Sequence, residues 1–406
     1  MAILSRSDHS FAGSHSTGRS LAVAIVAAEL AIMFVGATLP TPLYPLYRTA
    51  FGFGGVTLTL IYAVYVLGNL IALLIFGRLS DQIGRRLTTY PAIGIGIISV
   101  LVFIAAQGTS ALFVARVLSG FATGLASGTA TAWLAELLPK NDDGASAQTA
   151  CAANFSGLAV GPLIAGILAQ LAPWPLRLPY AVYLVILIAI GFAVAWAPET
   201  VANPKQRLSD LSLRPRLGVP RDIRLQFVSP AVTAFVTFAL IGFYAALIPG
   251  VLSESLDEKA PIASGSIVFA LFVVAAVATL LTRRIRSAAA MLSGLGLLLP
   301  GLAVLISAEV FHSMFLLVTA SVVGGIAAAL GYRGSLEVVN GIAPSDRRSE
   351  VVSSYLIAVY VGNSVPVIGI GLLTAVTGSL AAHLTFAIVI ALFAVAALAV
   401  GAKYSK

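Results

Sequence analysis

Charge is scarce in this chain of 406 residues: only 10% of them are charged, whereas 59% are hydrophobic. A soluble protein carries about 25% charged residues and about 45–50% apolar ones. No water-soluble fold hides so large an apolar excess, so the excess must face lipid. This composition excludes a cytosolic enzyme and a nucleic-acid-binding protein, although the formal net charge is +8.

Cysteine and histidine are also rare. The one cysteine, Cys151, excludes a disulfide framework and a cysteine-built metal or iron–sulfur site. The four histidines form no closely spaced pair, so we expect no metal and no cofactor. The sequence contains no H-E-x-x-H, no nucleophile elbow and no P-loop. We therefore expect neither a membrane enzyme nor a pump driven by ATP.

Long apolar runs make up most of the chain. A helix that spans the hydrocarbon needs about 20 apolar residues. Twelve runs approach that length, at 20–45, 56–76, 88–106, 111–137, 147–171, 178–197, 228–251, 263–281, 288–307, 313–336, 350–374 and 379–401. The runs are continuous, whereas the strands of a membrane β-barrel alternate over about ten residues. The sequence therefore predicts an all-α membrane protein with twelve transmembrane helices.

Lysine and arginine are distributed unequally between the two sides of this predicted bundle. With the N-terminus in the cytoplasm, nineteen of them lie on the cytoplasmic side and three outside, namely Arg48, Arg177 and Lys259. Short loops rich in Lys and Arg stay in the cytoplasm. We therefore expect a multi-pass protein of the bacterial inner membrane with both termini in the cytoplasm.

A polar stretch at the midpoint separates two halves that repeat. It covers 198–227 and contains four prolines and six basic residues, which favours a cytoplasmic linker. Five positions match at an offset of 205 residues: Arg78 with Arg283, Gly120 with Gly325, Pro139 with Pro344, Gly157 with Gly362 and Gly166 with Gly371. We expect an N-terminal six-helix bundle at 1–197 and a pseudo-symmetric C-terminal one at 228–406. Such parallel repeats are typical of transporters, which bind their substrate between the halves.

The loop after the second predicted span, GRLSDQIGRR at 77–86, carries a recognisable motif. It resembles the signature loop of the major facilitator superfamily, with Gln82 in place of a basic residue. The matching residues are Gly77, Leu79, Ser80, Asp81, Gly84, Arg85 and Arg86. The two glycines suit a close helix approach and a tight turn.

In that superfamily the loop acid, the loop arginine and an acid after the fourth span form a cytoplasmic cluster that latches the outward-open state. The resemblance maps this gate to Asp81, Arg85 and Glu136. It implies that the cluster forms when the halves close on the cytoplasmic side and breaks when they part.

Two of the ionisable residues within predicted spans, Arg116 and Glu29, are candidates for proton coupling. Arg116, in ARVLSGFATGLASG (115–128), resembles the arginine of the superfamily's fourth-span motif, which is associated with proton coupling; a cation in hydrocarbon is costly and marks a functional cavity. Glu29 lies in the first span, and acids placed so before a proline, here Pro40, recur in drug/proton antiporters. A carboxylate that alternates between burial and a guanidinium neighbour takes up and releases a proton. We therefore assign proton coupling to Glu29 and Arg116; the alternative places the Glu29 carboxylate at the cytoplasmic interface.

The fifth span, NFSGLAVGPLIAGILA at 154–169, resembles the antiporter motif of the same superfamily. The matching residues are Gly157, Gly161, Pro162 and Gly166, with Ala165 in place of one glycine. The proline bends the helix and the glycines let a neighbour approach. Within the superfamily this motif is typical of exporters.

Substrate contacts are predicted from polar and aromatic residues inside the spans. Tyr62, Tyr65 and Asn69 share one face of the second span, and Asn154 and Asn363 are amides in the fifth and eleventh. Packing or an interfacial position is the alternative for each of them.

These resemblances imply a monomeric drug/proton antiporter that exports small amphipathic compounds, with a small-molecule substrate, protons and the lipid bilayer as its partners. The alternative is a proton-coupled carrier of a specific metabolite such as a sugar, an amino acid or an organic acid. We also expect a local ion pair between Arg333 and Glu337, and we assign no role to His312 or His383.

Overall fold

The computed structural model describes residues 9–138, 145–202, 204, 217–344 and 347–404, and within these ranges it contains helices and no strand. Eleven of the described helices are long and apolar enough to cross a membrane. A twelfth apolar helix, α8 (Leu178–Val194), has 17 residues and is shorter than the predicted span 178–197. That length still lies at the lower end of the range that spans a bilayer, about 17–25 residues. The all-helical fold predicted from the apolar runs is confirmed.

The helices fall into two groups in chain order, which we name the first and the second group. The long helices of the first group are α1 (His9–Thr38), α3 (Gly55–Phe76), α5 (Arg85–Ile104), α6 (Thr109–Leu137), α7 (Ala145–Leu171) and α8. Three short elements connect them: η1 (Thr41–Leu43), α2 (Tyr44–Phe51) and α4 (Leu79–Ile83). The second group contains η3 (Arg221–Ile223), α9 (Arg224–Ser255), α10 (Pro261–Leu281), α11 (Ser287–Val310), α12 (Met314–Ile342), α13 (Arg348–Thr377) and α14 (Ser379–Tyr404).

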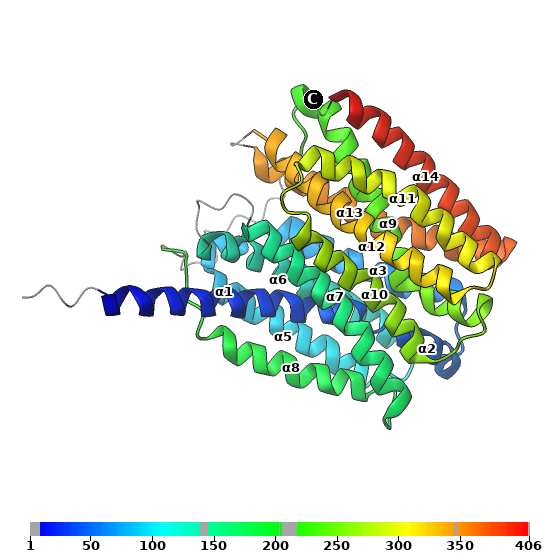
Figure 1. Ribbon diagram of the computed structural model, residues 1–406. Coiled ribbons are helices and arrows are strands. Elements are labelled where there is room, and N and C mark those ends of the chain that lie inside the picture. Colours follow the sequence, from blue (N-terminus) through cyan, green and yellow to red (C-terminus); the bar gives the residue numbers. More distant parts are fainter. Residues whose placement is uncertain (1–8, 139–144, 203, 205–216, 345–346, 405–406) are drawn as a thin grey trace, which may run out of the picture.

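The predicted linker 198–227 is shortened at its end because α9 begins at Arg224. Residues 203 and 205–216 of that linker lie outside the described residues. We call the end of the bundle that holds α4 and the start of α9 the linker end. The opposite end, which holds α2, is called the far end (Figure 1).

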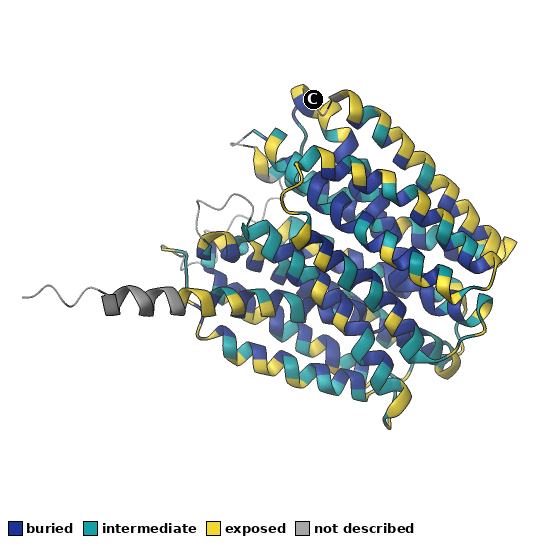
Figure 2. Cartoon of the chain, viewed as in Figure 1, coloured by how far each residue is buried: buried dark blue, intermediate teal, exposed yellow. Residues whose placement is uncertain are grey.

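Large apolar side chains are exposed on the outer helices, where a soluble protein would place polar ones. Leu392 on α14 is 65% exposed, and Phe192 on α8 is 72% exposed. Figure 2 shows exposed residues along α8 and α14, which lie on the outside of the bundle, while the interior is buried. A surface so rich in exposed apolar residues fits a lipid environment.

Helix α7 lies between the two groups because its glycines permit close contacts on two faces. A Cβ at Gly157 would overlap the carbonyl of Ala31, and one at Gly161 would come within 2.5 Å of the Val35 oxygen, both on α1. A Cβ at Gly166 would come within 2.6 Å of the Pro261 oxygen on α10. Small residues at such contacts let helix backbones approach closely in a membrane protein.

Candidate functional site: a central cavity and a charge cluster

A cavity lies between the two groups near the middle of the bundle. Most of its walls are aromatic or aliphatic, with a few polar groups among them. The lining residues are Phe34, Ala37, Thr38, Tyr62, Tyr65, Arg116, Asn154, Leu158, Phe238, Ile241, Ala245, Phe272, Tyr332, Leu356, Val359, Tyr360 and Asn363. An apolar cavity with a few convergent polar groups is the usual form of a small-molecule site.

Four of the five residues predicted to contact a substrate line this cavity: Tyr62, Tyr65, Asn154 and Asn363. Tyr62 donates a hydrogen bond of 3.0 Å to Oδ1 of Asn363, and so joins the first group to the second. Asn69, the fifth residue, is fully buried behind the cavity, where its amide nitrogen donates to the Tyr65 hydroxyl at 3.4 Å. The structure therefore places Asn69 next to a wall residue and not on the wall.

Arg116 is fully buried on α6 and lines the same cavity. Its guanidinium donates to the carbonyl oxygens of Ala37 at 2.8 Å and Tyr62 at 3.3 Å. Its central carbon lies 5.5 Å from the ring centre of Tyr62 and 4.6 Å from that of Tyr65, a cation–π geometry. Oxygen dipoles and ring faces thus hold the cation in place.

Glu29 is buried on α1, with 1% of the residue exposed, so its carboxyl group does not reach the surface as the alternative prediction required. Its Oε1 atom has no hydrogen-bond partner. Arg116 binds α1 at Ala37, which is eight residues further along the helix. At 1.5 Å per residue the two positions are about 12 Å apart along the axis. The structure therefore does not bring Glu29 and Arg116 into an ion pair.

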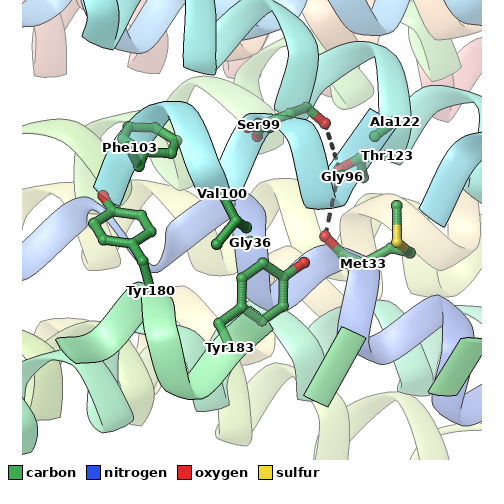
Figure 3. A pocket seen from close by; sticks show the side chains of 11 residues that line it. Met33, Gly36, Gly96, Ser99, Val100, Phe103, Ala122, Thr123, Tyr180 and Tyr183 are labelled. Atoms are coloured by element: carbon green, nitrogen blue, oxygen red, sulfur yellow. Dashed lines mark hydrogen bonds between the residues drawn. The ribbon is translucent and has the colours of Figure 1, made fainter. Parts of the chain in front are cut away.

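A smaller cavity lies inside the first group, where α1 contributes Met33 and Gly36 to its lining (Figure 3). There Thr123 donates to the carbonyl of Met33 at 3.4 Å, and the ring of Tyr180 stacks on Phe103 with 4.5 Å between centres. A Cβ at Gly36 would collide with Tyr183, which leaves α1 no room to move toward α8. This cavity is enclosed by one group of helices, whereas the central cavity is shared by both.

The charge cluster predicted from the loop motif is present at the linker end. Arg85 bonds Asp81 through Nη1 and Glu136 through Nη2, the second at 2.6 Å. Its side chain is 6% exposed, although those of Asp81 and Glu136 are 53% and 37% exposed. Nη1 also donates to the Ser80 hydroxyl at 2.7 Å. The three residues named from the sequence therefore lie in direct contact.

Sequence reasoning missed two members of this cluster, Glu199 and Thr200, which directly follow the first group. The Glu199 carboxylate accepts hydrogen bonds from the backbone N–H groups of Arg85 at 2.9 Å and Arg86 at 3.0 Å, and so caps the start of α5. Thr200 donates to Glu136. The signal that the sequence offered was the position of Glu199, an acid that closely follows the last apolar run of the first group.

The structure also differs from the prediction that this cluster breaks when the two groups separate on the cytoplasmic side. Each partner of Arg85 found in the described residues belongs to the first group or to Glu199. Gly84, at φ +113°, turns the chain so that Arg85 can face Asp81 and Glu136. The ion pairs thus form within one group and do not depend on contact with the other.

The two groups are joined at the far end. Thr41 donates to the Ala245 carbonyl at 2.7 Å, and the backbone N–H of Ile262 donates to Oε1 of Gln170 at 3.2 Å. An ion pair of 3.6 Å between Arg48 and Glu254 also bridges them. Together with the Tyr62–Asn363 bond, these interactions close the bundle from its centre to the far end in this structure.

Among the described residues of the second group, two buried contacts join an acid to a basic side chain. Arg333 binds Glu337 at 3.1 Å, as predicted, and also donates to the Thr282 and Ile285 carbonyls. The other pair was not predicted: Nδ1 of His383 on α14 lies 2.9 Å from Glu309 on α11, with side chains 5% and 0% exposed.

Comparisons with known proteins agree with this geometry. A family model described as Major Facilitator Superfamily matches residues 27–306. The quinolone resistance protein NorA of Staphylococcus aureus (strain MRSA252) is 27% identical over 217 residues, which is 52% of this chain and 54% of that protein. The chain thus spans about half the length of the curated relatives it matches.

Two solved structures share the fold over nearly their whole length. A bacterial homologue of the human lysosomal transporter Spinster, in an inward-facing and unoccupied conformation, has a TM-score of 0.72 at 16% identity and covers 95% of this chain and 98% of its own. The human organic anion transporter MFSD10 (TETRAN) has a TM-score of 0.66 at 17% identity, with 93% and 99% covered.

Proposed function

The chain belongs to the major facilitator superfamily, and from that membership we propose that it exports small amphipathic compounds from a bacterial cytoplasm in exchange for protons. It is a membrane transporter and not an enzyme. The observation that carries the proposal is the aromatic cavity shared by the two groups while the far end is joined. A cavity at the joint of two repeats, closed at one end, fits alternating access.

We propose that the linker end faces the cytoplasm, because the topology predicted from the sequence assigns nineteen Lys and Arg residues to that side and three to the other. The described form then has its outer side joined and corresponds to an inward-facing state. The two halves predicted from the repeat, 1–197 and 228–406, would rock about the cavity, with 198–227 connecting them in the cytoplasm as one monomer.

For proton coupling we propose Glu29 as the carrier. Its carboxyl group is buried on α1, the helix that also supplies Phe34, Ala37 and Thr38 to the cavity. A change of charge at a buried group alters the packing of its helix because an isolated charge in an apolar interior is unstable. Protonation of Glu29 would therefore alter the packing of α1, which lines the cavity. This coupling does not require an ion pair between Glu29 and Arg116.

We further propose that the Asp81–Arg85–Glu136 cluster stabilises the outward-open state by offering a preformed surface to the second group. Gly77, Gly84 and Arg86 shape this loop, and Glu199 holds its helix start. Asp81→Asn should then slow transport and increase the labelling of cysteines engineered at the linker end. Unchanged labelling would leave the loop with only a topological role.

The export proposal is tested in cells that lack their own efflux pumps. Cells with this chain should accumulate less of one or more amphipathic dyes than cells without it, and a proton uncoupler should remove the difference. In proteoliposomes, an imposed proton gradient should drive the dye against the direction of proton flow. Dye that moves with the protons would instead support the metabolite carrier, and no effect on any dye would contradict export of amphipathic compounds.

A further inference from the structure

Arg116 differs from the other buried arginines because it has no acidic partner. Arg85 is bound by Asp81 and Glu136, and Arg333 is bound by Glu337. Within the described part of the chain, no carboxylate lies within ion-pair distance of Arg116, although the residue is 0% exposed. Burying a cation without a counter-charge costs free energy. The positive charge of Arg116 is therefore not compensated within the described part of the chain.

The groups around Arg116 orient the guanidinium without neutralising it. Carbonyl oxygens of Ala37 and Tyr62 accept two of its N–H bonds, and the ring of Tyr65 covers one face. Nε is buried and has no hydrogen-bond partner. These neutral contacts hold the charge at one position on the wall and use two of the five N–H donors of the guanidinium.

The cavity wall offers no carboxylate that could serve as the partner. Its lining contains tyrosines, phenylalanines, aliphatic residues, Thr38 and two amides, so Arg116 is the one formally charged residue on the described wall. Glu29, the nearest acid by sequence on α1, lies about two helical turns away from the Arg116 contact at Ala37. An ion pair at Arg116 in this form therefore requires an anion other than the described residues of the wall.

We propose that Arg116 binds the anionic group of the transported compound, and that the substrates are amphipathic monoanions with a flat apolar body and one carboxylate. One guanidinium neutralises one carboxylate and can hold it by parallel N–H bonds. The aromatic walls, including Phe238, Phe272 and Tyr332, accommodate the apolar body. The amides of Asn154 and Asn363 supply polar contacts on the same wall.

This inference rests on the proposed function and narrows its substrate class. It also agrees with the proposed direction of transport, because the membrane potential of a cell with a negative interior drives an anion outward. The exchange of an entering proton for a leaving anion is then favoured by the potential at both steps.

The test compares two ligands that differ in charge and share a ring system, naphthoate and naphthamide. Their affinities are measured by calorimetry with the purified full-length protein in detergent. The wild type should bind naphthoate about tenfold more tightly than naphthamide, the ratio expected for one charge-assisted interaction. Arg116→Gln should reduce this ratio to about one while naphthamide binding remains.

Arg333→Gln is the matched control, because it removes a buried arginine that is already paired with an acid. It should leave the ratio of the two affinities unchanged. Arg116→Lys should retain part of the preference, since the charge is kept and the planar fork is lost.

The wild-type measurement is decisive even if the Arg116 variants fail to fold. Equal affinity for the two ligands, tighter binding of naphthamide, or no binding of naphthoate would each overturn the anion site. The dye experiment decides the export proposal separately, so an exporter of neutral or cationic dyes with no preference for naphthoate would retain the proposed function and lose this inference.

Discussion

At the scale of single residues, the proposed exchange depends on whether Glu29 can take up and release a proton. The carboxyl group is buried and its Oε1 atom has no partner. Glu29→Gln keeps the volume and the hydrogen-bonding capacity but removes the titration. We expect the variant to fold and to lose proton-driven export completely, measured as dye efflux from proteoliposomes under an imposed pH gradient.

The control for Glu29→Gln is the same substitution at Glu258, an acid in the connection between α9 and α10 that accepts a hydrogen bond from the Ala260 N–H. Glu258→Gln should leave export driven by the gradient intact. Gradient-driven efflux that survives in Glu29→Gln would show that another group carries the proton.

The Glu309–His383 pair allows a second residue-scale prediction, about stability. Both side chains are almost completely buried, so removing either one leaves the other without its partner. Glu309→Ala and His383→Ala should each lower the free energy of unfolding by about 3–5 kcal/mol. The double variant should lose clearly less than the sum, because it leaves no unpaired buried group. Thermal unfolding of the three variants in detergent measures this, and additive losses would mean that the two groups do not interact.

Residue types identify some of these groups from the sequence and miss others for a physical reason. Arg116 and Tyr62 were named because a cation and an aromatic hydroxyl stand out within apolar runs. Glu309 and His383 are 74 residues apart on separate helices, and they meet only because α11 and α14 pack with particular rotations. A single sequence does not specify that rotation, so their pairing could not be predicted.

At the scale of elements, α7 carries the residues that resemble the antiporter motif, and those residues determine how closely α7 packs against its neighbours. Gly161 contacts α1 so closely that a Cβ would lie 2.5 Å from the Val35 oxygen. Gly161→Ala should therefore force the two helices apart, at a cost of about 1–3 kcal/mol in unfolding free energy. It should also slow transport, because α1 contributes to the cavity on one face and carries Glu29. Unfolding in detergent and dye efflux in vesicles measure the two effects.

Gly369 on α13 provides the comparison, since a Cβ there would meet no atom within 4 Å. Gly369→Ala should leave both stability and efflux close to wild type. If Gly161→Ala behaved in the same way, the close approach of α7 to α1 would have no functional importance.

Apolar runs predicted the long helices well because length and hydropathy are properties of each segment alone. Their ends were predicted less well. The run 20–45 extends past Pro40 into η1 and α2, which continue the chain along the far end as separate short helices. The start of α9 at Arg224 was assigned to the linker because polar residues at the membrane edge can be helical or irregular. Contacts with neighbouring elements determine whether such residues are helical or irregular.

At the scale of the whole molecule, the proposed transport requires the chain to exchange a form joined at the far end for one joined at the linker end. Twelve apolar runs and a repeat are compatible with both forms, so the sequence predicted the architecture and could not show which end is closed. The described form is closed by Thr41 with Ala245, Gln170 with Ile262 and Arg48 with Glu254. Of these, the ion pair is the one that a side-chain substitution removes with least effect on packing.

Arg48→Gln should therefore shift the population toward the form that is open at the far end. The two side chains are 38% and 46% exposed, so the pair contributes at most about 1 kcal/mol to closure. That value corresponds to a shift of up to about fivefold in the equilibrium. A cysteine introduced by Leu58→Cys, at a buried position on the wall of the far-end crevice beside Arg48, should react up to about fivefold faster with a membrane-impermeant reagent added to intact cells.

Lys259→Gln is the matched control because it breaks a far-end ion pair of 3.4 Å with Asp257, within a single connection of the second group. The control should leave labelling at Leu58 unchanged, since no contact between the groups is lost. Equal acceleration in both variants would mean that net charge at the far end, and not the Arg48–Glu254 bridge, sets the rate. No labelling in any intact cell would place the far end in the cytoplasm and reverse the proposed orientation.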